Sequence, residues 1–289
     1  MTGERTGTGW ASLMGWRSTH GGWLAQHLVS TGTAAIGRAV LLQSQSPAVL
    51  EGVTTQQNWF RPGNRFAARA FGGMIDRLGS EATVIPGEYV MVPLALARSL
   101  HSGPARAVVE LDGGASPELA ELARRARGEL YVRSEELDQG DLRLAETDWL
   151  YRLVGLRRHR RIWVRQETDG RLLGAAVAYR GPLGLNFSFL ENRCDLLVAP
   201  DQDPQEADRT VRVLTAAVRA AYEDFEPGAV PMTLTGAAAP LLTTLGAEPV
   251  QPYSQGIWTA DAAGDWQRHI DALYRQRSGG RLATSRSAA

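Results

Sequence analysis

Residues 194–225 read CDLLVAPDQDPQEADRTVRVLTAAVRAAYEDF and predict a strand followed by a long helix. Cys194–Val198 is a short, mostly apolar run with a proline two residues after it. A short apolar run that ends at such a turn signal is typical of a buried strand. From Pro204 to Phe225, apolar residues recur at helical spacing and predict one buried stripe. These apolar positions are Val211, Leu214, Val218, Ala221, Tyr222 and Phe225. Asp203, the proline after it and Glu206 form the pattern of a helix N-terminus.

The elements around this segment predict a sheet covered by helices. A hairpin is predicted from Arg161–Gln166 and Leu172–Tyr179, with a turn at Asp169-Gly170. Ser116-Pro117 predicts the start of another helix. The other predicted elements are a helix at Leu144–Val154, strands at Leu185–Leu190, Val230–Leu234 and Gln251–Thr259, a helix from Ala237 to Leu245 ended by Gly246, and a closing helix capped by Asp265 that buries Trp266, Ile270 and Leu273. We therefore expect an α/β (α+β) fold on a mixed, mostly antiparallel sheet.

The N-terminal part of the chain predicts a further α/β region. Residues 1–20 are rich in Gly, Thr and Ser and are expected to lack regular structure, as is the tail 278–289. The elements expected between them and residue 111 are a short helix at Trp23–Leu28, strands at Arg38–Gln43 and Leu50–Thr55, a helix at Arg65–Leu78 ended by Gly79, and strands at Ala82–Ile85, Glu88–Leu94 and Arg106–Leu111. The predicted domains are thus 21–111 and 112–277.

The composition excludes several classes of function. The chain has 31 basic and 31 acidic residues, so no global field would attract nucleic acid or a membrane. All basic residues are arginine, which removes lysine-based Schiff-base and P-loop chemistry and suggests a GC-rich bacterial genome. Cys194 is the only cysteine and the five histidines are scattered, so no metal site is expected. A cytoplasmic protein is expected, with a homodimer as one possible assembly.

The order of elements from Arg106 to Asp261 resembles the GCN5-related N-acetyltransferase (GNAT) family, the acyl-CoA N-acyltransferase superfamily. The resemblance rests on the hairpin GRLLGAAVAY (170–179), on LLVAP (196–200), similar to the family's L-x-V-x-P strand ending, and on AAAPLLTTLGA (237–247). It implies acetyl-CoA or another acyl-CoA as co-substrate and acyl transfer to a small-molecule or peptide amine. It also implies that Leu197, Val198 and Arg209 contact the cofactor.

The loop before the long helix departs from the family's pattern. The family has a Gly-rich stretch there, whose backbone N–H groups bind pyrophosphate. This chain has no glycine in the loop and has carboxylates at Asp201, Asp203 and Glu206. A capping carboxylate occupies the free N–H groups and repels phosphate by roughly 0.3–1 kcal/mol. The loop therefore favours a self-capped helix over a phosphate cradle.

The resemblance also implies a general base near the strand and a general acid after the small helix. Glu191 is the candidate base and Tyr253 the candidate acid. Glu191 could instead form an ion pair with Arg193, and Tyr253 could simply lie at a strand end. Cys194 is interpreted as a small buried hydrophobe, because no histidine is near it in the sequence.

Three alternatives remain open. A catalytically inactive GNAT-like binding module would explain the carboxylate-rich loop. The spacing of Arg157 and Arg161, with Asn186-x-Ser188, resembles the PilZ domain, a β-barrel that binds cyclic di-GMP. The region before residue 111 could also be a degenerate second copy of the fold, with FRPGNR (60–65) as an anion site or as a turn capped by Asn64.

Overall fold

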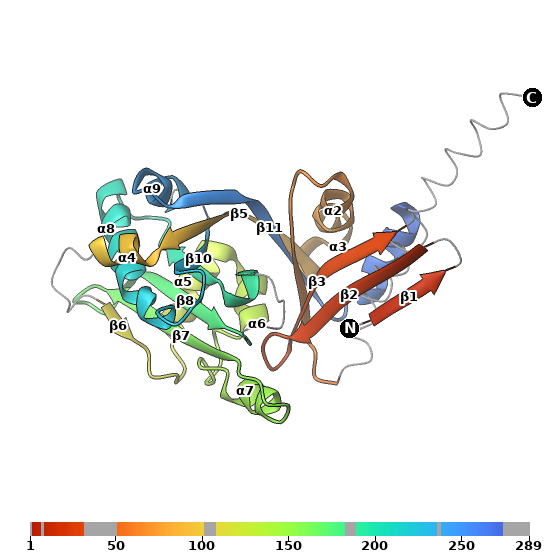
Figure 1. The fold of residues 1–289 in the computed structure, drawn as a ribbon, viewed down its shortest axis with the longest axis horizontal. Coiled ribbons are helices and arrows are strands. Elements are labelled where there is room, and N and C mark those ends of the chain that lie inside the picture. Colours follow the sequence, from red (N-terminus) through yellow and green to blue (C-terminus); the bar gives the residue numbers. More distant parts are fainter. Residues whose placement is uncertain are drawn as a thin grey trace, which may run out of the picture. The chain divides into compact units, whose positions relative to one another are not determined.

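The computed structural model describes residues 2–6, 9–31, 51–100, 108–182, 189–235 and 238–273 (Figure 1). The strands are β1 (Thr2–Thr6), β2 (Gly9–Arg17), β3 (Gly22–Thr31), β4 (Thr55–Phe60), β5 (Ala82–Pro93), β6 (Val108–Glu110), β7 (His159–Gln166), β8 (Leu172–Arg180), β9 (Cys194–Val198), β10 (Ala229–Leu234) and β11 (Glu248–Thr259). The α-helices are α2 (Arg65–Ala70), α3 (Ile75–Leu78), α4 (Leu94–Ser99), α5 (Pro117–Arg127), α6 (Glu129–Glu135), α7 (Ala145–Arg152), α8 (Pro204–Val218) and α9 (Ala238–Thr244). Residues 263–273 form a further helix. The 3₁₀ helices are η1 (Gly72–Met74), η2 (Gly79–Glu81), η4 (Phe189–Asn192) and η5 (Arg219–Ala221).

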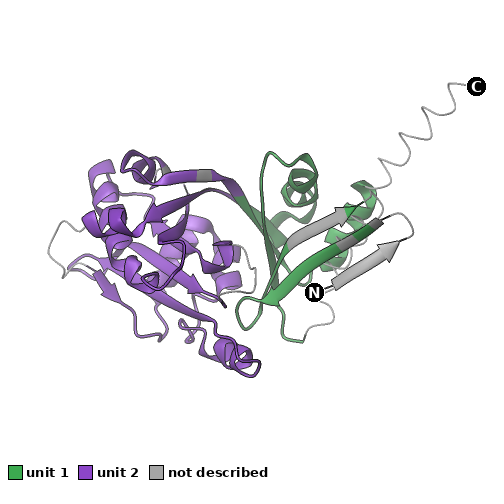
Figure 2. Cartoon of the chain, viewed as in Figure 1, with its two compact units in different colours: residues 1–84, 254–289 green, residues 85–253 purple. Residues whose placement is uncertain are grey.

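The strands form one mixed sheet flanked by helices, which confirms the predicted fold class. They are hydrogen-bonded in the order β1-β2-β3-β4-β11-β5-β10-β9-β8-β7-β6. Residues 1–84 and 254–289 form one compact unit, unit 1, and residues 85–253 form the other, unit 2 (Figure 2). These bounds differ from the sequence-based ranges, because β5 and β11 each run from the residues of one unit into those of the other.

In unit 2, three antiparallel pairs join β6, β7, β8 and β9 in turn. The next strand, β10, is parallel to β9 and antiparallel to β5. The consecutive residues Cys194 and Asp195 point to opposite faces of the sheet. Cys194 packs in the apolar cluster with Val211 and Leu214 of α8, whereas Asp195 accepts a hydrogen bond from Tyr131 of α6. Helices α8 and α6 therefore cover opposite faces.

Gly174 lets α8 approach the sheet closely. A Cβ atom at this position would lie 2.5 Å from Thr210 Cγ2 and 2.8 Å from the Leu197 carbonyl oxygen. Both distances are too short for a side chain, so the glycine in the middle of β8 is explained by packing.

Unit 1 repeats the strand directions of unit 2. The strands β1, β2 and β3 are antiparallel, β4 is parallel to β3, and β11 is antiparallel to β4. In each unit, a run of antiparallel strands is thus followed by one strand that pairs with it in parallel. The next strand is antiparallel again and comes from the other half of the sequence. This repeat supports the hypothesis that the N-terminal part is a second copy of the fold.

Several expected elements differ in the structure. Residues 1–20 were expected to lack regular structure but contain β1 and all of β2, and Leu13 and Trp16 of β2 are buried. The register of β2 against β3 shifts between Ser12 and Met14, which changes the alternation and hides the strand pattern in the sequence. The segment expected as a short helix, Trp23–Leu28, belongs to β3.

The expected helix at Arg65–Leu78 consists of α2, η1 and α3, because Gly72-Gly73 interrupts it. Ala82–Leu94 was expected as two strands, but β5 is continuous through Pro93. The closing helix begins at residue 263, so Asp265 lies within it rather than at its cap. The expected strands at 38–43 and 185–190 fall largely or wholly outside the described residues, as do 274–289.

Candidate functional site

The candidate site lies where β9 loses its partner β10. The parallel pairing of these strands is limited to Cys194 with Met232 and Asp195 with Thr233. β10 ends at Leu234, and among the described residues no strand pairs with this side of β9 beyond Asp195. We call the backbone of Leu196–Val198 on this side the β9 edge.

Alternation along β9 decides which residues supply this edge. The Ala199 N–H donates to the Leu173 carbonyl at 3.0 Å, and the Tyr179 N–H donates to the Arg193 carbonyl at 2.9 Å. Odd-numbered residues of β9 therefore direct their backbone groups to β8, and even-numbered ones direct theirs to the opposite side. The predicted cofactor residues thus differ in role, because Val198 presents its backbone at the β9 edge and Leu197 bonds to β8. Leu196 presents its carbonyl there too, whereas its N–H faces Thr233 within the pairing with β10, and the sequence analysis missed this residue.

The N-terminus of α8 is capped by its own carboxylate, as the sequence predicted. Asp203 Oδ1 accepts from the Gln205 N–H at 2.9 Å and from the Glu206 N–H at 3.0 Å. Asp201 pairs with Arg125 at 2.6 Å and with Arg171 at 3.5 Å, and these partners lower the pKa of its carboxyl. The N–H groups that bind pyrophosphate in the family that the sequence resembles are therefore already used here.

A buried polar network holds the first turns of α8 on the sheet. Arg165 of β7 donates to Thr210 Oγ1 at 2.6 Å and forms an ion pair with Glu206. Thr210 in turn donates to Gln202 Oε1 at 2.8 Å, and Gln202 donates to the Leu173 carbonyl. Each polar group thus has a partner, so the loop and the helix start are fixed together.

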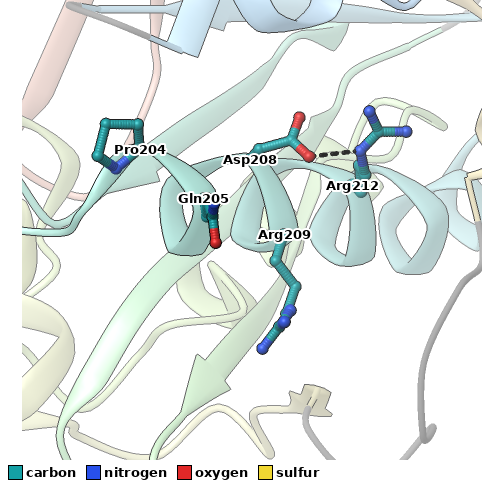
Figure 3. Close-up of a pocket in the computed structure, with 5 residues that line it drawn as sticks. All are labelled: Pro204, Gln205, Asp208, Arg209 and Arg212. Carbon is teal, nitrogen blue, oxygen red and sulfur yellow. Dashed lines mark hydrogen bonds and ion pairs between the residues drawn. The ribbon is translucent and has the colours of Figure 1, made fainter.

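A shallow surface pocket of about 570 Å³ lies along α8 (Figure 3). Its lining residues are Pro204, Gln205, Asp208, Arg209 and Arg212. Arg209 contacts Glu206 at 3.3 Å, and its side chain is 65% exposed. Arg212 is hydrogen-bonded to Asp208 at 2.7 Å (Figure 3). The predicted phosphate ligand Arg209 therefore lies at this pocket with a second arginine one turn away.

Glu191, the predicted base, lies in η4 with its side chain fully buried. It forms an ion pair with Arg158, whose side chain is also fully buried. Its expected partner Arg193 instead contacts Glu135 at 2.8 Å and Asp195 at 3.0 Å. A carboxylate held by a buried guanidinium is a weak base, because protonation would leave that cation without its counter-charge. The geometry therefore favours a structural role for Glu191.

Asp195 is the centre of a charged cluster, and the sequence analysis gave this residue no role. Its carboxylate accepts from Tyr131 Oη at 2.8 Å and from Thr233 Oγ1, and it contacts Arg127 at 3.5 Å. Burial raises the pKa of this carboxyl, but Arg193, Arg127 and the two hydroxyls outweigh that effect and lower it. The signal in the sequence is a single charged residue inside an otherwise apolar strand. The alternation of side chains along β9 places this residue on one face of the sheet. The cluster fixes the point where β9 and β10 separate.

Tyr253, the predicted acid, lies on β11 and is half-buried. Its hydroxyl accepts a hydrogen bond from Gln251 Nε2 at 3.1 Å, and its ring meets that of Tyr89 edge-on with 6.0 Å between centroids. These contacts do not include Glu191, so the two predicted catalytic residues are not brought together by any described contact.

The remaining chemical candidates have other roles. Burial raises the pKa of the Cys194 thiol, as expected for a packed side chain rather than a nucleophile. Asn64 caps α2 by accepting from the N–H groups of Phe66 and Ala67, so that loop is a capped turn. No group of metal-binding side chains occurs among the described residues, and none of their helices is long and apolar enough to cross a bilayer.

The PilZ alternative is wrong on architecture. Within unit 2 the strands follow the order β5-β10-β9-β8-β7-β6, and no pairing between β5 and β6 closes them into a barrel among the described residues. Arg157 contacts Asp148 at 3.1 Å, and Arg161 makes two hydrogen bonds to Glu110. The Asn186-x-Ser188 motif lies outside the described residues.

No protein-family model matches the chain, and no curated protein matches it significantly. Similar solved structures include a GCN5-related N-acetyltransferase from Sphaerobacter thermophilus, with 12% identity, a TM-score of 0.38 and coverage of 88% of this chain and 77% of that one. They also include Saccharomyces cerevisiae N-myristoyltransferase with bound myristoyl-CoA, with 9% identity, a TM-score of 0.41 and coverage of 87% and 63%. A conserved protein of unknown function from Staphylococcus epidermidis has 8% identity, a TM-score of 0.43 and coverage of 82% and 84%.

Proposed function

We propose that this protein is an acyltransferase that takes an acyl thioester of coenzyme A as donor and a small-molecule or peptide amine as acceptor. The observation that carries the proposal is the β9 edge, where the Leu196 carbonyl and the Val198 N–H and carbonyl lie beyond the pairing with β10 and have no strand partner among the described residues. Pantetheine contains two amides in an extended chain, so it can pair with such an edge as an added strand does. The thioester would then lie beside Asp195, where β9 and β10 separate.

The proposed reaction is direct attack. The neutral amine nitrogen bonds to the thioester carbonyl carbon and releases a proton to solvent water, the carbon–sulfur bond breaks, and the leaving thiolate takes up a proton. We assign that proton to the Tyr253 hydroxyl, as the resemblance implies, and the tyrosinate then regains a proton from water. Glu191 is given no part in proton transfer, because it is buried against Arg158. Tyr253→Phe is expected to lower turnover by roughly 10²-fold or more with little change in stability.

The phosphates of the donor would be held by side chains rather than by the helix N-terminus. Asp203 occupies the N–H groups there, whereas Arg209 and Arg212 line the pocket along α8. Arg209→Gln is therefore expected to weaken binding of acyl-CoA about fivefold to tenfold and to leave binding of an acyl-pantetheine without phosphates unchanged. Arg219→Gln, in η5 after the end of α8, is the matched control.

Thermal unfolding with added ligand tests the donor site. Acetyl-CoA, longer acyl-CoAs and free CoA are compared at concentrations up to millimolar. A donor present at 100 times its Kd adds about 2.7 kcal/mol of stability, which raises the Tm by roughly 5 °C or more. If no CoA thioester changes the Tm, the proposed donor is wrong.

A proline at the β9 edge tests the binding mode. Val198→Pro removes an N–H that points away from β8, so the pairing with β8 is kept. We expect this variant to lose the stabilisation by acyl-CoA, whereas Val198→Ala, which keeps the N–H, retains it. Equal stabilisation of both variants would contradict pairing of the donor with this edge.

A non-catalytic binding module is the second candidate. The carboxylates at the start of α8 favour it, because Asp201 and Asp203 put negative charge where the related enzymes bind pyrophosphate. Binding of an amine ligand without any response to a CoA thioester, and without turnover, would support this candidate.

A further inference from the structure

Helix α7 and the turn after it expose a cluster of large apolar side chains. Trp149, Leu150, Leu153 and Val154, the α7 patch, are 60%, 40%, 65% and 71% exposed. Trp149 and Leu153 are four residues apart, as are Leu150 and Val154, so the cluster lies along one side of the helix end. The other large apolar residues exposed in the described part of the chain lie on other elements.

The exposed residues Leu153 and Val154 lie at a helix end whose backbone is fixed by hydrogen bonds. The Leu156 N–H donates to the Tyr151 carbonyl at 3.0 Å, and the Gly155 N–H donates to the Arg152 carbonyl at 3.0 Å. Gly155 has a φ of 76°, and these two bonds form the Schellman motif that ends helices. Leu153 and Val154 are therefore held in place at the surface and are not part of a frayed end.

Two arginines lie beside the patch and are fixed by one buried carboxylate. Asp148 contacts Arg152 at 2.6 Å and Arg157 at 3.1 Å, and it accepts from the Arg158 N–H at 2.9 Å. The side chains of Arg152 and Arg157 are 58% and 63% exposed. Glu146, in the first turn of α7, is the exposed carboxylate of the helix. The C-terminal end of the patch is thus edged by positive charge.

The size of the patch argues against a second copy as its partner. Its exposed apolar surface is roughly 400 Å², taking large side chains as about 150–250 Å² each. Two such patches in a symmetric dimer would bury about 800 Å², which is in the range of crystal contacts and below that of stable dimers. A tryptophan with aliphatic neighbours and flanking arginines is instead the composition of a protein surface that enters the interface of an anionic bilayer.

We propose that the α7 patch binds the surface of anionic membranes, with Trp149 and its neighbours in the interfacial layer and Arg152 and Arg157 near lipid phosphates. This site does not depend on the proposed acyl transfer. If both hold, the protein would meet its donor or acceptor at a lipid surface.

Co-sedimentation of the full chain with vesicles tests the proposal. Vesicles of phosphatidylcholine alone are compared with vesicles of phosphatidylcholine mixed with the anionic lipid phosphatidylglycerol. We expect binding to the anionic vesicles, and we expect Trp149→Ser to weaken it about tenfold or more, because the exposed ring provides much of the buried area. Trp10→Ser, a change of another tryptophan that is 45% exposed, is the matched control and should bind like the wild type.

The arginines and the oligomeric state give two further readouts. Arg157→Gln is expected to weaken binding to the anionic vesicles about fivefold and to leave any binding to neutral vesicles unchanged. Absence of binding, or equal binding of the Trp149→Ser and Trp10→Ser variants, would overturn the proposal. A dimer in sedimentation velocity that Trp149→Ser dissociates would overturn it too, in favour of a second copy of the chain.

Discussion

Asp195 keeps a negative charge in the interior of unit 2 because four side chains hold it there. Arg193 and Arg127 supply opposite charge, and Tyr131 and Thr233 donate hydrogen bonds. Asp195→Asn removes the charge, so each of the two buried arginines loses one anionic partner. We expect a loss of about 3–5 kcal/mol in the free energy of unfolding, measured with urea. The exposed Asp201→Asn should change the stability much less, because its ion pairs are open to solvent.

The same carboxylate predicts how stability depends on pH. Its pKa is lower in the folded protein than its ordinary value of 3.8, so the unfolded chain binds the proton more readily. The stabilisation is therefore complete above the ordinary value and is lost as the pH falls through the folded value. We expect the free energy of unfolding to fall on acidification below about pH 5 and to fall less steeply in Asp195→Asn. A steeper fall in the variant would contradict this assignment.

Glu191 offers a test between a structural and a catalytic role. If its main function is to neutralise the buried Arg158, Glu191→Gln lowers stability by about 3 kcal/mol. Replacing Glu191 and Arg158 together by leucine should then recover most of that loss, because no unpaired charge remains. If Glu191→Gln keeps its stability but has no turnover, Glu191 acts as the general base instead.

These residues also mark the limit of prediction from the sequence. The cap at Asp203 was predictable, because the capping residue, the proline and the N–H groups it serves are neighbours in the chain. The partner of Glu191 was not, since Arg158 is far away in the sequence and nearby Arg193 was the obvious choice. Both Glu191 and Arg193 find their partners through the sheet and α6, and that geometry has no local signal.

At the scale of elements, α8 and β8 were predictable. In each, apolar residues recur at a regular spacing, and residues typical of caps or turns mark the ends. Their close approach was not, although Gly174 gave a hint as a glycine in the middle of a strand. The failures have physical causes as well. A bulge hides the alternation of β2, and paired glycines divide a helix that its apolar positions had predicted as continuous.

Gly174→Ala tests the contact between α8 and the sheet. The added methyl group would lie 2.5 Å from Thr210 Cγ2 and 2.8 Å from the Leu197 carbonyl oxygen, so α8 or the strand must shift. We expect a loss of about 1–3 kcal/mol, measured by chemical unfolding. At Gly63 nothing lies within 4 Å of the added atom, and Gly63→Ala should be close to neutral. Equal stability of the two variants would show that the contact is not tight.

For the whole molecule, the sequence predicted a mixed sheet but not the exchange of strands between its halves. The order of elements in the chain suggests domains that follow one another. Instead, each unit obtains one antiparallel strand from the other half of the sequence, β5 in unit 2 and β11 in unit 1. Pairing between strands so far apart in the sequence depends on the whole fold, and no local sequence pattern indicates it.

This exchange predicts that the C-terminal residues are needed to complete the N-terminal unit. β11 pairs with β4 from Ser254 with Phe60 to Thr259 with Thr55. Trp258 and Trp266 stack with 5.3 Å between ring centroids, and both belong to the apolar cluster that includes Phe71. A chain that ends at Tyr253 should therefore be cut rapidly by protease within residues 51–84, because β4 loses its neighbour and the cluster loses two large rings. A chain that ends at residue 273 keeps both and should resist like the full chain. Mass spectrometry of the fragments distinguishes the two, and equal resistance of both shortened chains would mean that unit 1 folds without β11.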